Sequence, residues 1–98
     1  MLPIPPIPYL IQKSLGIPLS EIDEEKQSQV IIDLTNVFYE FIFEYIEIEY
    51  SRADSIKLQT AHKNNLNIFQ KFPELEKKYQ IATKKYFEML EGGDEFSE

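Results

Sequence analysis

Apolar residues are densest between residues 30 and 50, and their spacing is that of a helix. Fourteen of these twenty-one residues are aliphatic or aromatic, and five are carboxylates. When the segment is placed on a helix at about 100° per residue, four of the carboxylates fall within an arc of about 60°. They are Asp33, Glu40, Glu44 and Glu47. Apolar residues cover roughly two thirds of the circumference, so we expect this helix to pack against neighbours on several sides.

The same segment is rich in Phe, Tyr, Ile and Val, which favour strands. A strand with one buried face requires alternation, however, and the apolar runs at 30–32 and 41–43 break it. No Gly or Pro interrupts the segment to form a hairpin. We therefore predict one long helix that starts near Glu21, with Ser20 as its N-cap, and continues to Tyr50.

Shorter elements are predicted on both sides of the long helix. Residues 9–15 have the pattern of a short helix that ends at Gly16, because glycine is the usual residue at a helix C-terminus. Residues 51–55 are predicted to form a hinge, in which Asp54 or Ser55 can cap the next helix. The long helix is thus expected to have a helical neighbour at each end.

The C-terminal half of the domain is less regular. Residues 56–72 include three Asn, which are weak helix formers, and this leaves open whether the stretch is one helix or two. Pro73 suits the first position of a final helix, because proline has no N–H that a helix would use there. Apolar residues at steps of three and four then continue the helical pattern to about residue 91.

Together these elements predict an all-α protein, a small helical bundle of three to four helices built around one long central helix. We expect a Pro-rich N-terminal arm at 1–8, a single helical domain at 9–91 and an acidic tail at 92–98. A chain of 98 residues has room for one core. The short helices offer too few apolar stripes to cover the long one, so we expect the bundle to dimerise or to bind another protein.

The first eight residues contain four prolines, Pro3, Pro5, Pro6 and Pro8. Because proline fixes φ and restricts the residue before it, extended or polyproline II backbone is expected here. The Pro-x-x-Pro spacings match a ligand of proline-binding domains, so an adaptor that presents this segment is one alternative function. The apolar residues between the prolines could equally lie over the core of the same chain.

The net charge of -7 is distributed unevenly along the chain. Residues 21–50 hold nine acids and one base, whereas residues 51–91 hold eight bases and five acids. These two parts could pair within one chain or between two chains. Proteins that bind nucleic acid usually carry a basic face, so the acidic balance argues against a nucleic-acid partner.

Composition also bears on compartment and membrane. The chain has no Cys, which excludes disulfides and thiolate metal sites and fits a cytoplasmic location. Residues 30–50 have the length of a membrane span, but Glu40 and Glu44 lie near its middle, at about 2.5 to 3.5 kcal/mol each for a comparable acid. Helices that lie on membranes carry Lys or Arg on their polar face, whereas this one carries Glu. No membrane association is expected.

The order of these signals resembles a family of small, acidic, all-helical bacterial domains of unknown function. The residues that carry the resemblance are the short helix leading into Leu15-Gly16-Ile17, the acidic start of the long helix at 20–25, and Phe72-Pro73-Glu74-Leu75 before the last helix. The resemblance covers about residues 9–91. It implies a helical fold and no assigned activity.

The acidic stripe suggests a second alternative function, a carboxylate metal-binding bundle. Glu40, Glu44 and Glu47 are one turn apart in succession, as metal ligands on a helix are. Di-iron bundles, however, combine Glu from two helices with Glu-x-x-His from two more, and the single His62 is not part of such a motif. The simpler interpretation is that the stripe is the solvated side of the helix.

Enzymatic motifs are not found in the sequence. His62 lies in a polar stretch without a nearby Ser or carboxylate pair, and we expect it at the surface rather than in a catalytic site. There is no Gly-rich phosphate loop and no nucleophile elbow. We therefore predict a protein without enzymatic activity and without a cofactor.

The leading functional hypothesis is a protein–protein interaction or structural module that associates through the long helix, with itself or with another protein. Aromatic side chains dominate the energetics of interfaces, so they are the expected contacts. We predict the contacts at Phe38, Phe41, Ile42, Tyr45, Ile46 and Tyr50. The competing interpretation is that these side chains form the intramolecular core.

Overall fold

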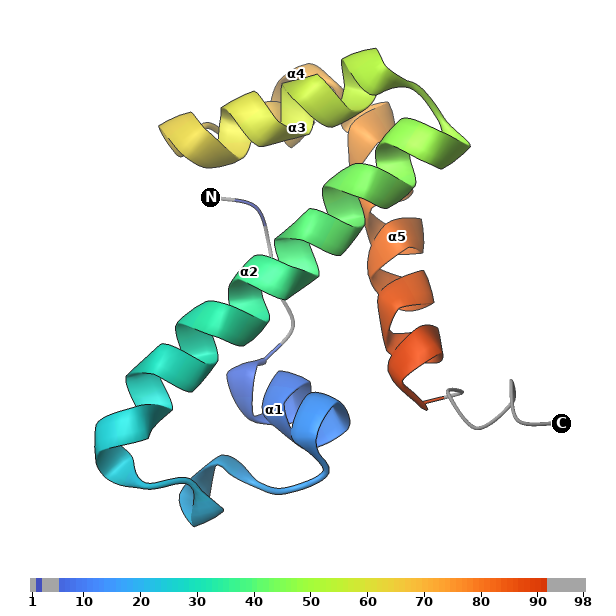
Figure 1. Cartoon of the computed structure of the whole chain (residues 1–98). Coiled ribbons are helices and arrows are strands. Elements are labelled where there is room, and N and C mark those ends of the chain that lie inside the picture. Colours follow the sequence, from blue (N-terminus) through green and yellow to red (C-terminus); the bar gives the residue numbers. More distant parts are fainter. Residues whose placement is uncertain (1, 3–5, 92–98) are drawn as a thin grey trace, which may run out of the picture.

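The computed structural model describes residue 2 and residues 6–91, which form helices joined by short turns (Figure 1). No strand occurs in these residues, and this confirms the predicted all-α class. In chain order the elements are α1 (Ile7–Leu15), the 3-10 turn η1 (Leu19–Glu21), α2 (Glu24–Glu49), α3 (Arg52–Asn64), α4 (Ile68–Lys71) and α5 (Pro73–Glu91). The predicted acidic tail at 92–98 lies outside the described residues.

Helix α1 begins at Ile7, so the extended backbone predicted for residues 7 and 8 is wrong. Pro8 lies in the first turn, where a helix has no partner for the missing N–H and where the fixed φ of proline is suitable. At the other end Gly16 is left-handed, with φ of 75°, and donates its N–H to the carbonyl oxygen of Gln12 at 2.8 Å. The end predicted at Gly16 is confirmed.

The long helix begins at Glu24, later than predicted, and Ser20 is not its N-cap. The turn η1 precedes it, and Ile22 is extended. The side-chain amide of Gln27 donates hydrogen bonds to the carbonyl oxygens of Leu19 at 3.2 Å and Ile22 at 2.9 Å. Because these bonds satisfy carbonyl groups that a continuous helix would use internally, they stabilise the break before α2.

The connection from α2 to α3 is shorter than the predicted hinge at 51–55. Ser51 is the N-cap of α3, and its Oγ accepts a hydrogen bond from the backbone N–H of Asp54 at 3.1 Å. The stretch 56–72 is divided between α3 and the single turn of α4. Asn65 ends α3 in the left-handed conformation, with φ of 56°, which Asn tolerates better than most residues.

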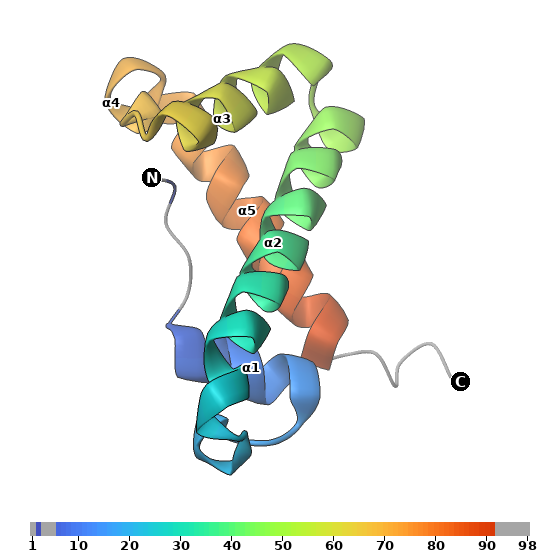
Figure 2. The same ribbon diagram turned by 60° about the vertical axis from the view of Figure 1, so that its left-hand side comes forward.

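The other helices pack around α2 (Figures 1 and 2). Helix α3 turns back from the C-terminal end of α2, and α1 packs beside the N-terminal part of α2. Helix α5 starts at Pro73, as predicted, and crosses α2. The large side chains that these contacts bury completely are Leu10, Ile11, Phe38, Ile42, Ile46, Leu58 and Leu75. The molecule is flat, with extents of 40 × 38 × 17 Å along its principal axes.

Two polar contacts join α3 to its neighbours. The fully buried Ser55 donates its Oγ–H to the carbonyl oxygen of Phe43 in α2 at 2.7 Å. Asp54 and Lys78 form an ion pair at 2.6 Å that joins α3 to α5. The hydrogen bond from Lys78 lowers the pKa of the Asp54 carboxyl below its ordinary value. These contacts fix how α3 is placed relative to the long helix.

Candidate interaction surface on α2

The inner face of α2 belongs to the core of the chain. Phe38, Ile42 and Ile46 follow each other at helical spacing, and each is 0% exposed. The ring of Phe38 meets that of Tyr86 in α5 edge to face, with centroids 5.4 Å apart. Three of the six predicted contact residues are therefore covered within the chain. The sequence pattern identified them as large apolar groups, a property that cores and interfaces share.

The other three predicted contact residues lie along the edge of α2 and are only partly covered. The ring centroid of Phe41 lies 5.1 Å from that of Tyr86 and 6.0 Å from that of Tyr45. Tyr45 in turn lies 6.4 Å from Tyr50. Phe41, Tyr45 and Tyr50 thus form an aromatic row that remains accessible from outside the bundle. For these three residues the interface stays a prediction.

The side of α2 that points away from the core carries both apolar and acidic side chains. Val37 is 50% exposed, and Ile48 is 69% exposed, the highest value among the large hydrophobic residues described. Glu40, Glu44 and Glu47 lie between them and are all exposed, as the helical spacing predicted. These five residues are termed the outer face.

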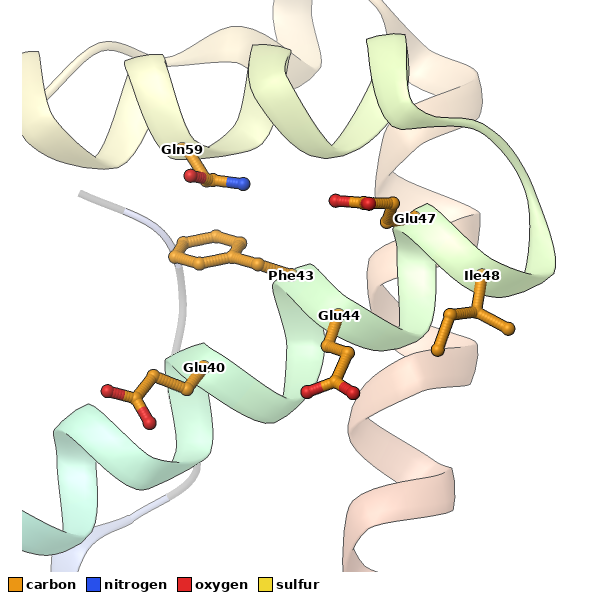
Figure 3. A pocket seen from close by; sticks show the side chains of 6 residues that line it. All are labelled: Glu40, Phe43, Glu44, Glu47, Ile48 and Gln59. Atoms are coloured by element: carbon orange, nitrogen blue, oxygen red, sulfur yellow. The ribbon is translucent and has the colours of Figure 1, made fainter.

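A hollow of about 590 Å³ opens between the outer face and α3 (Figure 3). Its lining consists of Glu40, Phe43, Glu44, Glu47, Ile48 and Gln59. Gln59 comes from α3, and it extends with Glu47 into the angle between the two helices, near the ring of Phe43 (Figure 3). The amide of Gln59 is held by a hydrogen bond from Nε2 to Ser55 Oγ at 3.0 Å. The hollow therefore combines one aromatic ring with an acidic margin.

A smaller hollow of about 230 Å³ is lined by Phe41, Glu44, Tyr45, Ile48 and Glu49. It connects the outer face with the aromatic row. Because Glu44 and Ile48 line both hollows, they form a ridge between them. Ile48 is not among the contact residues predicted from the sequence. The signal was present, because Ile48 lies one turn beyond Glu44 and directly after Glu47 on the helix.

The glutamates of the outer face have no cationic partner in the described part of the chain. The ion pairs found there are Lys13–Glu91, Lys26–Asp23, Lys78–Asp54 and Lys85–Glu88. None of them joins the glutamates of α2 to the basic second half, so the intramolecular pairing considered from the sequence is not formed by these residues. The outer face therefore keeps a negative potential.

The alternative metal site would use Glu40, Glu44 and Glu47. No three His, Asp or Glu side chains within the described residues are arranged so that they could hold a metal ion. Metal centres in helical bundles draw carboxylate ligands from several helices, whereas α3 presents the neutral Gln59 to the same hollow. This geometry favours a contact surface over a metal site.

His62, which was expected at the surface, is half-buried between α3 and α2. Its ring centroid lies 4.1 Å from that of Tyr39 and 6.0 Å from that of Phe43. Its Nδ1 is buried and has no hydrogen-bond partner among the described residues. The prediction was wrong because His62 lies one turn beyond the buried Leu58, on the side of α3 that faces α2.

The N-terminal segment is attached to the core at Leu2, which is 3% exposed. The hydroxyl of Tyr39 donates a hydrogen bond to the Leu2 carbonyl oxygen at 2.8 Å. Burial raises the pKa of Tyr39 to about 12, so the hydroxyl keeps its proton at neutral pH. Of the two interpretations of this segment, packing over the chain's own core holds for Leu2; Pro3 and Pro5 lie outside the described residues.

Within residues 6–91, no helix has both the length and the apolar character needed to cross a membrane. Comparison of the chain with protein-family models, with curated proteins and with solved structures finds no match. A functional assignment therefore depends on the surface of the molecule itself.

Proposed function

We propose that this protein is a non-enzymatic protein–protein interaction module that binds its partner through the outer face of α2 and the adjoining aromatic row. The observation that carries the proposal is Ile48, which is 69% exposed on the ridge between two hollows. Single exposed hydrophobic residues are common on proteins. A row of apolar residues bordered by hollows and by charge is the arrangement typical of binding surfaces.

The partial burial of the aromatic row supports the same proposal. Phe41 and Tyr45 are half-buried, and the ring of Phe41 packs against that of Tyr86 with centroids 5.1 Å apart. Aromatic side chains in this state lose little conformational freedom on binding and gain contact area, which makes them suitable anchors.

The location belongs to the proposal as well. The chain has no Cys and therefore needs no oxidising compartment to form disulfides, so we propose that the module is cytoplasmic. The expected partner in that compartment is another protein or a second copy of the chain.

Site-specific photocrosslinking in the cells that make the protein tests the proposal. A photoreactive phenylalanine analogue replaces Ile48 in one variant and Ile32 in a control, which is 52% exposed on the same helix but away from the outer face. We expect a defined adduct from position 48 and none from position 32. The proposal is refuted if position 48 gives no adduct, or if both positions give the same adducts.

Light scattering after size exclusion identifies self-association in the same experiment series. An assembly at twice the 11.6 kDa chain mass that Ile48→Glu dissociates would mean that the partner is a second copy. A constant mass of one chain, together with an adduct from position 48, would mean that the partner is a different protein. Far-UV circular dichroism of each variant verifies that the helices are retained.

A further inference from the structure

We propose that the partner of the outer face is a basic amphipathic helix of another protein, in which Lys or Arg residues border an apolar stripe. This inference rests on the proposed function and names the chemistry of its partner. It is carried by the position of exposed apolar side chains on α2 beside glutamates that no cation of the described chain neutralises.

The charge of the outer face selects a basic partner. Glu40, Glu44 and Glu47 are exposed and follow each other at steps of four and three residues, so their carboxylates line up along about 10 Å of helix. Each can accept a charge-assisted hydrogen bond from an incoming Lys or Arg. A partner with cations at the same helical spacing matches all three, and the negative potential accelerates its approach.

The apolar part of the surface selects a helix rather than an extended basic segment. Ile48 stands between hollows of about 590 and about 230 Å³, with Phe43 on one side and Phe41 and Tyr45 on the other. Side chains three and four residues apart on a helix form ridges that fit such a ridge-and-hollow surface. The distance from Val37 to Ile48 along α2 is about 16 Å, which a partner helix of about three turns covers.

A second copy of this chain fits the outer face less well. Two copies related by a two-fold axis present the same surface to each other, so the glutamates of one copy would face glutamates of the other. Like charges brought together at an interface oppose binding. The basic side of α5 also lacks a matching apolar row, because Ile81 is the large apolar residue at helical spacing with Lys77 and Lys84.

A pair of synthetic peptides probes the inference directly. One is a fluorescently labelled amphipathic helix of about 18 residues composed of Leu and Lys, and the other carries Glu at every Lys position. Fluorescence anisotropy measures their binding to the full chain. We expect the Lys peptide to bind and the Glu peptide not to bind. Raising NaCl from about 0.05 M to about 0.5 M should weaken binding of the Lys peptide, because salt screens exposed charges.

Matched variants distinguish the effect of charge on the outer face from that of negative charge elsewhere on the chain. A triple variant of the outer face carries Glu40→Gln, Glu44→Gln and Glu47→Gln. A control triple carries Glu21→Gln, Glu24→Gln and Glu25→Gln; these glutamates are also exposed, and the change in net charge is the same. We expect about tenfold weaker binding of the Lys peptide to the first and less than about twofold to the second.

The apolar contribution has its own matched pair. Ile48→Ser removes the ridge between the hollows, and Ile32→Ser removes a comparably exposed isoleucine elsewhere on the helix. We expect about tenfold weaker binding for Ile48→Ser and no change for Ile32→Ser. Circular dichroism verifies that all variants remain helical before binding is compared.

The possible outcomes distinguish this inference from the proposed function. Equal weakening by the two triple variants, or equal binding of both peptides, overturns the basic helix as partner. A crosslinked adduct from position 48 at twice the chain mass also overturns it, because the occupant is then a second copy, while the proposed function stands. No adduct from position 48 refutes the proposed function and the inference with it.

Discussion

Ile42 and Ile48 allow a matched test of which side of α2 is core. The two side chains are identical and lie on the same helix, but Ile42 is 0% exposed and Ile48 is 69% exposed. Ile42→Ala removes three methyl or methylene groups from the core, at about 0.8 kcal/mol each, which gives about 2.4 kcal/mol. Incomplete closure of the resulting cavity brings the expected loss into the range of about 2 to 5 kcal/mol. Ile48→Ala should change the free energy of unfolding by at most about 0.5 kcal/mol.

Urea unfolding followed by far-UV circular dichroism measures both losses. With a slope of about 1–3 kcal/mol per M, Ile42→Ala should lower the midpoint by about 0.7 M or more, and Ile48→Ala by no more than about 0.5 M. A domain of this size has about 5–15 kcal/mol of stability, so the first variant could also unfold completely. Ile42→Val, with an expected loss of about 0.5–1.5 kcal/mol, then supplies a measurable substitute.

Two results would contradict the assignment of faces. One is a similar loss of stability for Ile42→Ala and Ile48→Ala. The other is a loss for Ile42→Ala that becomes smaller as protein concentration rises, because this dependence would place Ile42 in an interface between chains. The second result would also restore the original prediction that Ile42 is a contact residue.

Three further substitutions test contacts that fix the fold. Tyr39→Phe removes the hydrogen bond to the Leu2 carbonyl. Because the pKa of Tyr39 is raised to about 12, this hydroxyl should contribute about 2 kcal/mol to the stability that the wild type loses as pH rises from 10 to 12, and urea titrations of Tyr39→Phe should show a smaller decline. The hydrogen bond from Lys78 lowers the pKa of Asp54 from its ordinary 3.8, so this pair stabilises the fold above about pH 3.8 and its contribution is lost as the pH falls further. Asp54→Asn should cost about 1 kcal/mol at pH 7, and the stability of this variant should fall less steeply in acid than that of the wild type. Gly16→Ala should lower the melting temperature by about 4–8 °C, because an alanine in the left-handed conformation costs about 1 kcal/mol even though its Cβ would meet no other atom. An unchanged melting temperature would contradict the left-handed conformation of Gly16.

Local signals in the sequence located most of the helices but were less accurate at their ends. Gly16 and Pro73 marked boundaries correctly, because each acts through the backbone of its own turn. Ser20 was a reasonable cap by residue type, yet the side chain of Gln27 reaches back to stabilise an extended Ile22, and α2 starts later. Such a contact competes with the cap and is not visible in the residue pattern.

The candidate site shows the same division. The exposed row Glu40, Glu44 and Glu47 followed from helical periodicity, because a period of 3.6 residues alone places these carboxylates on one side. His62 was misplaced because its exposure depends on how α3 is rotated against α2. That rotation is set by contacts between helices distant in sequence, such as the hydrogen bond from Ser55 to the Phe43 carbonyl.

The sequence by itself determined the helical class, the long central helix and its acidic stripe, because these features depend on residues only a few positions apart. It also determined that α2 has more apolar surface than a single stripe. Only the tertiary structure decided which part of that surface is core. The positions of α1, α3 and α5 bury Phe38, Ile42 and Ile46 and leave Ile48 in the solvent, since burial depends on where distant helices pack rather than on the residue types themselves.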